Sequence, residues 1–159
     1  RAMEQRLDAY KIAPAAYKAL VGVETYIQTS GLEHSLVELV RMRASQINGC
    51  AFCLDMHSKD ARRAGETEQR LYLLNAWRDS RLYTPRERAA LAWAEALTLI
   101  AQSQAPDDVY AALKAQFTEK EIVDLTTLVA MINVWNRVSI GFRNQHPVPG
   151  EPEYQKKRA

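Results

Sequence analysis

The chain has 159 residues, 47% of them hydrophobic, which is enough for one domain that buries roughly two-thirds of the surface its unfolded chain would expose. Lys and Arg total 21 against 19 Asp and Glu, and without a sustained basic stripe we expect no nucleic-acid partner. No apolar run is long enough to span a bilayer, and no basic and apolar leader opens the sequence. We therefore expect no membrane partner and a cytoplasmic location.

Two helices are expected in the first third of the chain. Apolar residues recur at helical spacing from Pro14 to Gly31, with the proline suited to a first turn and the glycine to an exit. Ser35 and Glu38 have the Ser-x-x-Glu spacing of a capping box, which predicts a second helix that Asn48-Gly49 ends. In a capping box Glu38 would bond to the backbone at the helix start, so its carboxylate has a structural as well as a catalytic interpretation.

Three more helices are expected in the middle of the chain. One spans about Cys50 to Ala64 and ends at Gly65, and a short one runs from near Thr67 to Trp77. The segment Thr84-Pro85-Arg86-Glu87 combines a cap residue, a proline suited to the first helical position and a glutamate at the third. It predicts a long helix that continues through Ile100.

The last third completes an all-α pattern. A shorter helix is expected over Asp107–Phe117, followed by a capping box at Thr118 that opens a long helix up to Gly141. Prolines and a glycine predict an extended tail over residues 144–159. No segment alternates with the period of a strand. We expect an all-α bundle of about six to seven helices in a single domain, residues 1–159, whose core spans about residues 14–143.

The only two cysteines carry the clearest chemical signal. Cys50 and Cys53 are three residues apart, and His57 follows four residues later, so all three side chains fall within an arc of about 60° on one helix face. Free N–H groups and the helix dipole favour a thiolate in a first turn, which points to the earlier cysteine, Cys50. His57 can accept the Cys53 proton or donate one to a departing oxygen. This pattern indicates thiol redox chemistry.

Two further side chains are candidates for handling protons. Glu38 would reach the motif if the second and third helices pack against each other around the Asn48-Gly49 turn, and it could then orient His57 or relay a proton. His34, one turn before Glu38, is a rival base. The same cysteines, histidine and glutamate could instead bind zinc, or the cysteines could be inert core residues.

The order Glu38, Cys50, Cys53, His57 resembles the carboxymuconolactone decarboxylase and alkylhydroperoxidase D (AhpD) superfamily, whose peroxidase branch carries a glutamate followed by Cys-x-x-Cys-x-x-x-His. The similarity runs from about Leu36 to Arg143. It implies an AhpD-like helical subunit of a trimer or hexamer. It also implies a hydroperoxide reductase in antioxidant defence that cycles a disulfide between the two cysteines, with a dithiol or a thiol protein as reductant, and with no cofactor and no metal.

The resemblance also implies roles for the two thiols. Cys53 attacks the peroxide and Cys50 resolves the product to a disulfide. Some members carry a second histidine just before the second cysteine, where this chain has Phe52. That difference leaves open slower peroxidase chemistry, a different substrate, or a disulfide reductase that ignores peroxides. A non-catalytic redox sensor and a zinc-binding module are further alternatives. The decarboxylase branch lacks the cysteine pair, so decarboxylation is not expected.

Overall fold

The computed structural model describes residues 3–156, and no strand occurs in that part of the chain. The all-α expectation is confirmed, and the six longer helices account for the number expected. These six are α2 Pro14–Thr29, α3 His34–Asn48, α4 Ala51–Arg63, α6 Pro85–Thr98, α8 Asp107–Lys114 and α9 Glu119–Phe142. The shorter ones are α1 Ala9–Ile12, α5 Glu68–Tyr72, the 3-10 helix η1 Leu74–Asp79, α7 Ile100–Ser103 and α10 Pro152–Lys156.

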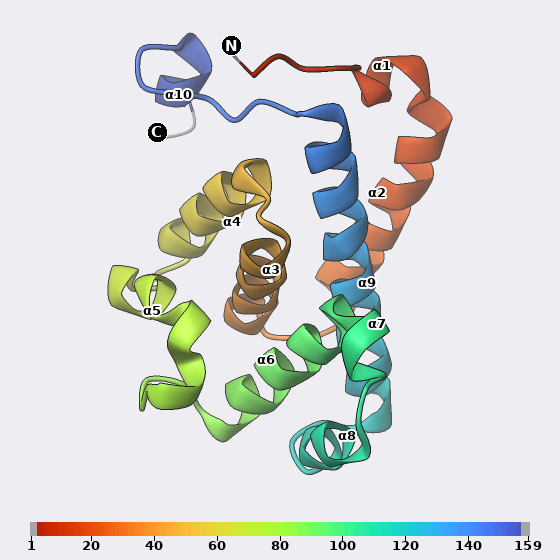
Figure 1. The fold of residues 1–159 in the computed structure, drawn as a ribbon, viewed down its shortest axis with the longest axis vertical. Helices are drawn as coiled ribbons and strands as arrows, with labels where there is room; N and C mark the ends of the chain where they lie inside the picture. The colour runs from red at the N-terminus through yellow and green to blue at the C-terminus, as the bar shows by residue number, and fades with distance from the viewer. Residues whose placement is uncertain (1–2, 157–159) are drawn as a thin grey trace.

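Helix α3 lies at the centre of the bundle. It packs against α4, α6 and α9, and α9 in turn packs along α2 (Figure 1). Helix α8 covers one end of α6 and α9, while α4 and α5 lie on the other side of α3 (Figure 1). Because α3 carries Glu38 and leads directly into the cysteine segment, the packing that fixes α3 also fixes the candidate site.

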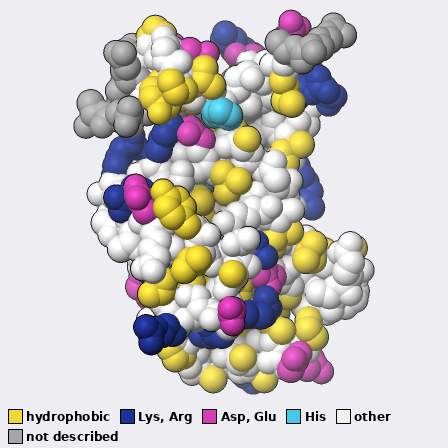
Figure 2. Space-filling view, turned by 60° about the vertical axis from the view of Figure 1, so that its left-hand side comes forward, with side chains coloured by type: hydrophobic (Ala, Val, Ile, Leu, Met, Phe, Trp, Pro, Cys, Tyr) yellow, Lys and Arg dark blue, Asp and Glu magenta, His cyan; other side chains and the backbone are white. Residues whose placement is uncertain are grey.

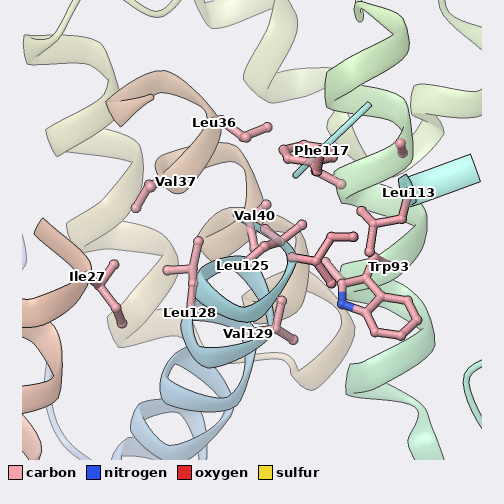
Figure 3. Packing of buried hydrophobic residues seen from close by; sticks show 14 of the residues in the cluster. Ile27, Leu36, Val37, Val40, Trp93, Leu113, Phe117, Leu125, Leu128 and Val129 are labelled. Carbon is pink, nitrogen blue, oxygen red and sulfur yellow. The ribbon is translucent and has the colours of Figure 1, made fainter. Parts of the chain in front are cut away.

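The main hydrophobic core joins α9 to the helices around it. Leu125, Leu128 and Val129 of α9 are fully buried, and they face Val40 of α3 and Trp93 of α6 (Figure 3). The same cluster includes side chains from α2 and α8. Removing this apolar surface of five helices from water is the main source of the stability that holds α3 in place.

Two of the three expected capping boxes are confirmed, and the third is wrong. Thr84 and Thr118 accept from the third residue of their helices, and each glutamate returns the bond. Ser35 does not cap α3, which begins one residue earlier with Glu33 as N-cap and no side-chain cap bond. Glu38 instead points inward from the second turn, where its carboxylate is hydrogen-bonded to Arg41 of the same helix and to His57 of α4.

Other boundaries differ from the sequence-based expectation. The expected helix over 67–77 divides into α5 and η1, and the helix expected to continue through Ile100 stops at Thr98 before the separate turn α7. Helix α9 continues past Gly141 and ends where Arg143 turns left-handed, with φ 55°. The tail is not extended throughout, because Pro152 opens the helix α10. The fixed φ of proline suits a first helical position, so Pro152 begins a helix rather than preventing one.

The surface mixes charges of both signs. On the side that carries α4 and α5, basic and acidic side chains are interspersed with apolar and neutral ones (Figure 2). None of the helices in residues 3–156 is both long and apolar enough to cross a membrane.

The core assignment predicts the cost of a cavity at Leu128, which has no exposed surface. Replacing Leu128 by Ala should lower the free energy of unfolding by about 2–5 kcal/mol, because the methyl groups lose their apolar contacts and leave a void. Guanidinium denaturation measures this. The control is Val123→Ala on the same helix, where the side chain is 62% exposed and a change within about 0.5 kcal/mol is expected. A loss below about 1 kcal/mol for Leu128→Ala would contradict the assignment.

Candidate functional site

Cys50 is the N-cap of α4. The left-handed Gly49, with φ 71°, ends α3 and turns the chain, and Cys50 then adopts an extended conformation before the first turn of α4. The backbone N–H of Cys53 donates to the sulfur of Cys50 over 3.3 Å. Both cysteines are about 1% exposed, and both are free thiols. The structure thus brings the two sulfurs together at a helix N-terminus, as their spacing predicts.

The two thiols are electrostatically unequal. The Cys53 thiol donates to the Cys50 sulfur and, despite the opposing effect of burial, lowers the pKa of Cys50 to about 7, with the Cys53 backbone N–H adding to this effect. Conversely, donation to Cys50, burial and the charge on Cys50 raise the pKa of Cys53. The pair therefore holds a single negative charge near neutral pH, and that charge resides on Cys50.

Polar side chains of α9 also contact the thiols, and the sequence alone assigned them no chemical role. Hydrogen bonds from Asn136 and Ser139 favour the charged form of the sulfurs. Asn136 is itself fixed, since it donates to the Ser45 hydroxyl over 3.0 Å and accepts from the Asn48 amide over 2.9 Å. A helical spacing of three between Asn133, Asn136 and Ser139 in an apolar helix is the signal that could have revealed this polar face.

Glu38 and His57 form a buried hydrogen-bonded pair. Packing of α3 against α4 brings Glu38 Oε2 to 3.0 Å from His57 Nδ1. Burial alone would raise the pKa of Glu38, but the hydrogen bond and charge of His57, together with Arg41, leave this pKa below its usual value. Because an ionised carboxylate only accepts hydrogen bonds, Nδ1 carries a proton whether or not the ring is charged, and Nε2 is then the nitrogen that can take up or release one. His57 lies one helical turn after Cys53.

A charged chain of hydrogen bonds extends from Glu38 to helix α2. Arg41 Nη1 donates to Glu38 Oε1 over 2.8 Å, and Arg41 Nη2 donates to Glu24 Oε2 over 2.6 Å. Neither Arg41 nor Glu24 belongs to a motif, and sequence reasoning missed both. His34, the rival base, has its Nε2 3.9 Å from Glu38 Oε1, and its side chain is 63% exposed. The buried imidazole of His57, not that of His34, is the one hydrogen-bonded to the carboxylate.

The zinc alternative finds no support at the thiols. Within the described residues, one group has three ligand atoms within 4.8 Å of one another, and it consists of Glu38, His57 and Asp60 without either cysteine. Glu38 already accepts from Arg41 at 2.8 Å, and Asp60 accepts from Arg63 at 3.0 Å. Both carboxylates of this group are thus already paired with arginines.

Two cavities flank this arrangement. One of about 400 Å³ lies beside Glu38 and is bordered by His34, Ala61 and Glu66. The other, of about 730 Å³, lies against a different face of α4 and is bordered by Leu54, Lys59 and Tyr154 among others. Neither is lined by Cys50 or Cys53, whose sulfurs lie beneath the surface.

The residues of this site lie in a segment that matches a known protein family. The profile of the carboxymuconolactone decarboxylase family matches residues 14–96, a segment that contains Glu38, both cysteines and His57 and begins before Leu36. The chain is 44% identical over 143 residues to the uncharacterized protein YdfG of Bacillus subtilis, covering 90% of this chain and 97% of that one.

Solved structures extend the comparison to the fold. A protein of unknown function from Agrobacterium tumefaciens, described as a candidate AhpD antioxidant defence protein, is 49% identical with a TM-score of 0.89, covering 91% of this chain and 99% of its own. The debrominase Bmp8 shares the fold at 20% identity, with a TM-score of 0.78 and coverage of 92% and 77%. The family profile matches more than half of this chain, and the chain therefore belongs to the carboxymuconolactone decarboxylase family and has the AhpD-like fold.

Proposed function

We propose that the protein is a thiol-dependent hydroperoxide reductase that cycles a disulfide between Cys50 and Cys53, in antioxidant defence and as a subunit of a homo-oligomer. The observation that carries the proposal is the thiolate stabilised at Cys50 by Cys53, on the same helix as an imidazole that a buried carboxylate orients. Peroxide reduction by Cys53 requires a group that takes its proton, a proton carrier for the leaving oxygen and a group that orients this carrier, and Cys50, His57 and Glu38 can serve as these three.

In the first step the Cys53 sulfur attacks a peroxide oxygen. The Cys53 proton passes along the existing hydrogen bond to the Cys50 sulfur, the O–O bond breaks, and Cys53 becomes a sulfenic acid. The leaving alkoxide takes the Nε2 proton of a His57 that enters the step protonated on both nitrogens, and it departs as an alcohol while His57 keeps its Nδ1 proton. Two facts favour Cys53 as the attacking sulfur, in line with the resemblance. His57 lies one turn from Cys53, and a thiolate of higher pKa is the stronger nucleophile.

In the second step the cysteines form a disulfide. The Cys50 thiol passes its proton to Nε2 of His57, its sulfur attacks the sulfenic sulfur, and the departing hydroxide takes that proton from His57 and leaves as water. A dithiol or thiol protein then reduces the disulfide and is itself oxidised to a disulfide. Because the thiol of lower pKa leaves faster, attack on Cys53 with departure of Cys50 is the favoured route.

A disulfide reductase is the second candidate function. It is favoured by the same acidic N-cap thiol, since a stabilised thiolate makes a disulfide more readily reduced and therefore more oxidising. The structural likeness to a debrominase indicates that the fold serves more than one chemistry. This candidate predicts exchange with small disulfides and no reaction with peroxides.

The charge assignment predicts where the pair titrates. In the reduced protein, alkylation should rise with pH through a midpoint near 7, and the first modified residue should be Cys50, because its pKa is lowered to about 7 while that of Cys53 is raised. Timed alkylation at a series of pH values on both sides of this midpoint, followed by peptide mass mapping, measures the midpoint and identifies the cysteine that is modified first. A midpoint near the ordinary thiol value of about 8.5 would remove the argument for a stabilised thiolate.

Single-cysteine variants test the peroxide cycle. Cys53→Ser should lose hydroperoxide consumption, because no attacking sulfur remains. Cys50→Ser should consume one equivalent and stop as a sulfenic acid, trapped with dimedone and located by mass spectrometry, because no thiol is left to resolve it. Ala51→Ser, which adds a hydroxyl to the same turn and keeps both thiols, is the matched control and should turn over like the parent.

Two results would count against this cycle. A sulfenic acid on Cys50 in the Cys53→Ser variant would reverse the order of the thiols. Undiminished turnover in either single-cysteine variant would refute the two-cysteine mechanism.

A further inference from the structure

We infer that Glu24 is a positioning residue for the site: by occupying one arm of the Arg41 guanidinium, it leaves the second oxygen of Glu38 free to hold His57. Glu24 lies on α2, outside the Cys-x-x-Cys helix and outside the sequence pattern that points to the site. The inference rests on the proposed function only for its kinetic readout.

The contacts form one continuous chain across four helices. From α9, Trp135 Nε1 donates to Glu24 Oε1 over 2.7 Å, and Glu24 Oε2 accepts from Arg41 Nη2 over 2.6 Å. Arg41 Nη1 then donates to Glu38 Oε1 over 2.8 Å, and Glu38 Oε2 lies 3.0 Å from His57 Nδ1. Each carboxylate oxygen and each terminal guanidinium nitrogen in the chain thus has one dedicated partner.

The division of Arg41 between two carboxylates determines what Glu38 can do. A guanidinium facing a single carboxylate tends to form two parallel bonds that engage both of its oxygens. Here the second arm of Arg41 is held by Glu24, so only Oε1 of Glu38 is engaged and Oε2 stays available for the imidazole. Without the Glu24 charge, Arg41 can take both oxygens of Glu38, and Nδ1 of His57 then loses its acceptor.

The burial of the chain shows that these contacts are more than a surface ion pair. Side-chain exposure is 19% for Glu24, 11% for Arg41, 3% for Glu38 and 9% for His57. Glu24 is fixed from behind as well, because Trp135 is stacked against Tyr10 and Tyr17 with ring centroids 6.5 and 6.3 Å away. Solvent screens these buried charges weakly, so removing one member of the hydrogen-bonded series changes the contacts of the next member.

The test uses Glu24→Gln, which keeps the volume and an acceptor for Trp135 but removes the charge that holds Arg41. Nitrogen-15 NMR of the reduced full-length protein, at a pH where the imidazole is neutral, reports which ring nitrogen of His57 carries the proton, and His57→Gln assigns the signal. The parent should show the proton on Nδ1. Glu24→Gln should show an exchanging mixture of the two tautomers.

Glu95→Gln is the matched control. Glu95 likewise accepts from an arginine of α3, Arg43, over 2.8 Å and from a tryptophan indole, Trp77, over 2.9 Å, but it does not contact Glu38. This variant should keep the parent tautomer. Arg41→Lys supplies a second test: in this background Glu24→Gln should keep the parent tautomer, because an ammonium cannot form the two parallel bonds that would engage both oxygens of Glu38. An unchanged His57 signal in Glu24→Gln, the same mixture of tautomers in the Arg41→Lys background, or an equal change in Glu95→Gln would overturn the inference.

The kinetic readout follows the same logic. Glu24→Gln should slow the single-turnover reaction with hydroperoxide by about tenfold, the lower end of what loss of an outer orienting partner costs at comparable sites. In a His57→Gln background it should cause no further loss, whereas a purely structural role would slow both backgrounds alike. If the protein does not react with peroxides, the proposed function fails, and the tautomer measurement still decides the role of Glu24.

Discussion

The buried charge of Glu38 is the constraint on which the rest of the site depends. A carboxylate that is only 2% exposed can stay ionised in the core because Arg41 and His57 together replace the water it has lost. Those partners lie on α3 and α4, so the charge also fixes how these two helices meet. The turn at Gly49 then has to place Cys50 at the start of α4, and the thiols follow from that geometry. Fold and chemistry are coupled at this one side chain.

The acidity of the thiols depends on a second group of polar contacts, which comes from α9. The sulfurs are buried beside Ala44 and Ile132, surroundings that by themselves disfavour a thiolate. Hydrogen bonds from Asn136 and Ser139 and the N–H groups of the first turn offset that cost, and one proton shared between the sulfurs leaves only one charge to stabilise. The result is an acidic Cys50 beside a weakly acidic Cys53, which suits a cycle that needs both a leaving group and a nucleophile.

Local patterns predicted local features, and contacts between distant residues escaped them. Thr84 and Thr118 cap their helices because every partner in a capping box lies within four residues. The face shared by Cys50, Cys53 and His57 follows from helical periodicity alone. Glu38 was harder to place, because Ser-x-x-Glu fits a cap as well as it fits a buried acid.

What decides the position of Glu38 is His57, 19 residues away. The contact between Asn136 and Ser45 spans 91 residues, and that between Glu24 and Arg41 joins two helices by an ion pair with no motif. Pairs of this kind depend on the crossing of packed helices, which one sequence does not encode in any short pattern. The cysteine spacing and the family resemblance singled out the thiols, His57 and Glu38, whereas the residues hydrogen-bonded around them emerged only from three-dimensional packing.

The most direct test of a dithiol peroxide cycle is a stoichiometric single turnover of the parent protein. Fully reduced protein is mixed with an organic hydroperoxide in the absence of any reductant, and the thiols lost and the alcohol formed are counted over time. The proposed cycle predicts that two thiols disappear and one alcohol forms for each chain, and that a Cys50–Cys53 disulfide is the product. Intact thiols in the presence of peroxide, combined with rapid oxidation of the same pair by a small disulfide, would contradict it and assign the protein to thiol–disulfide exchange.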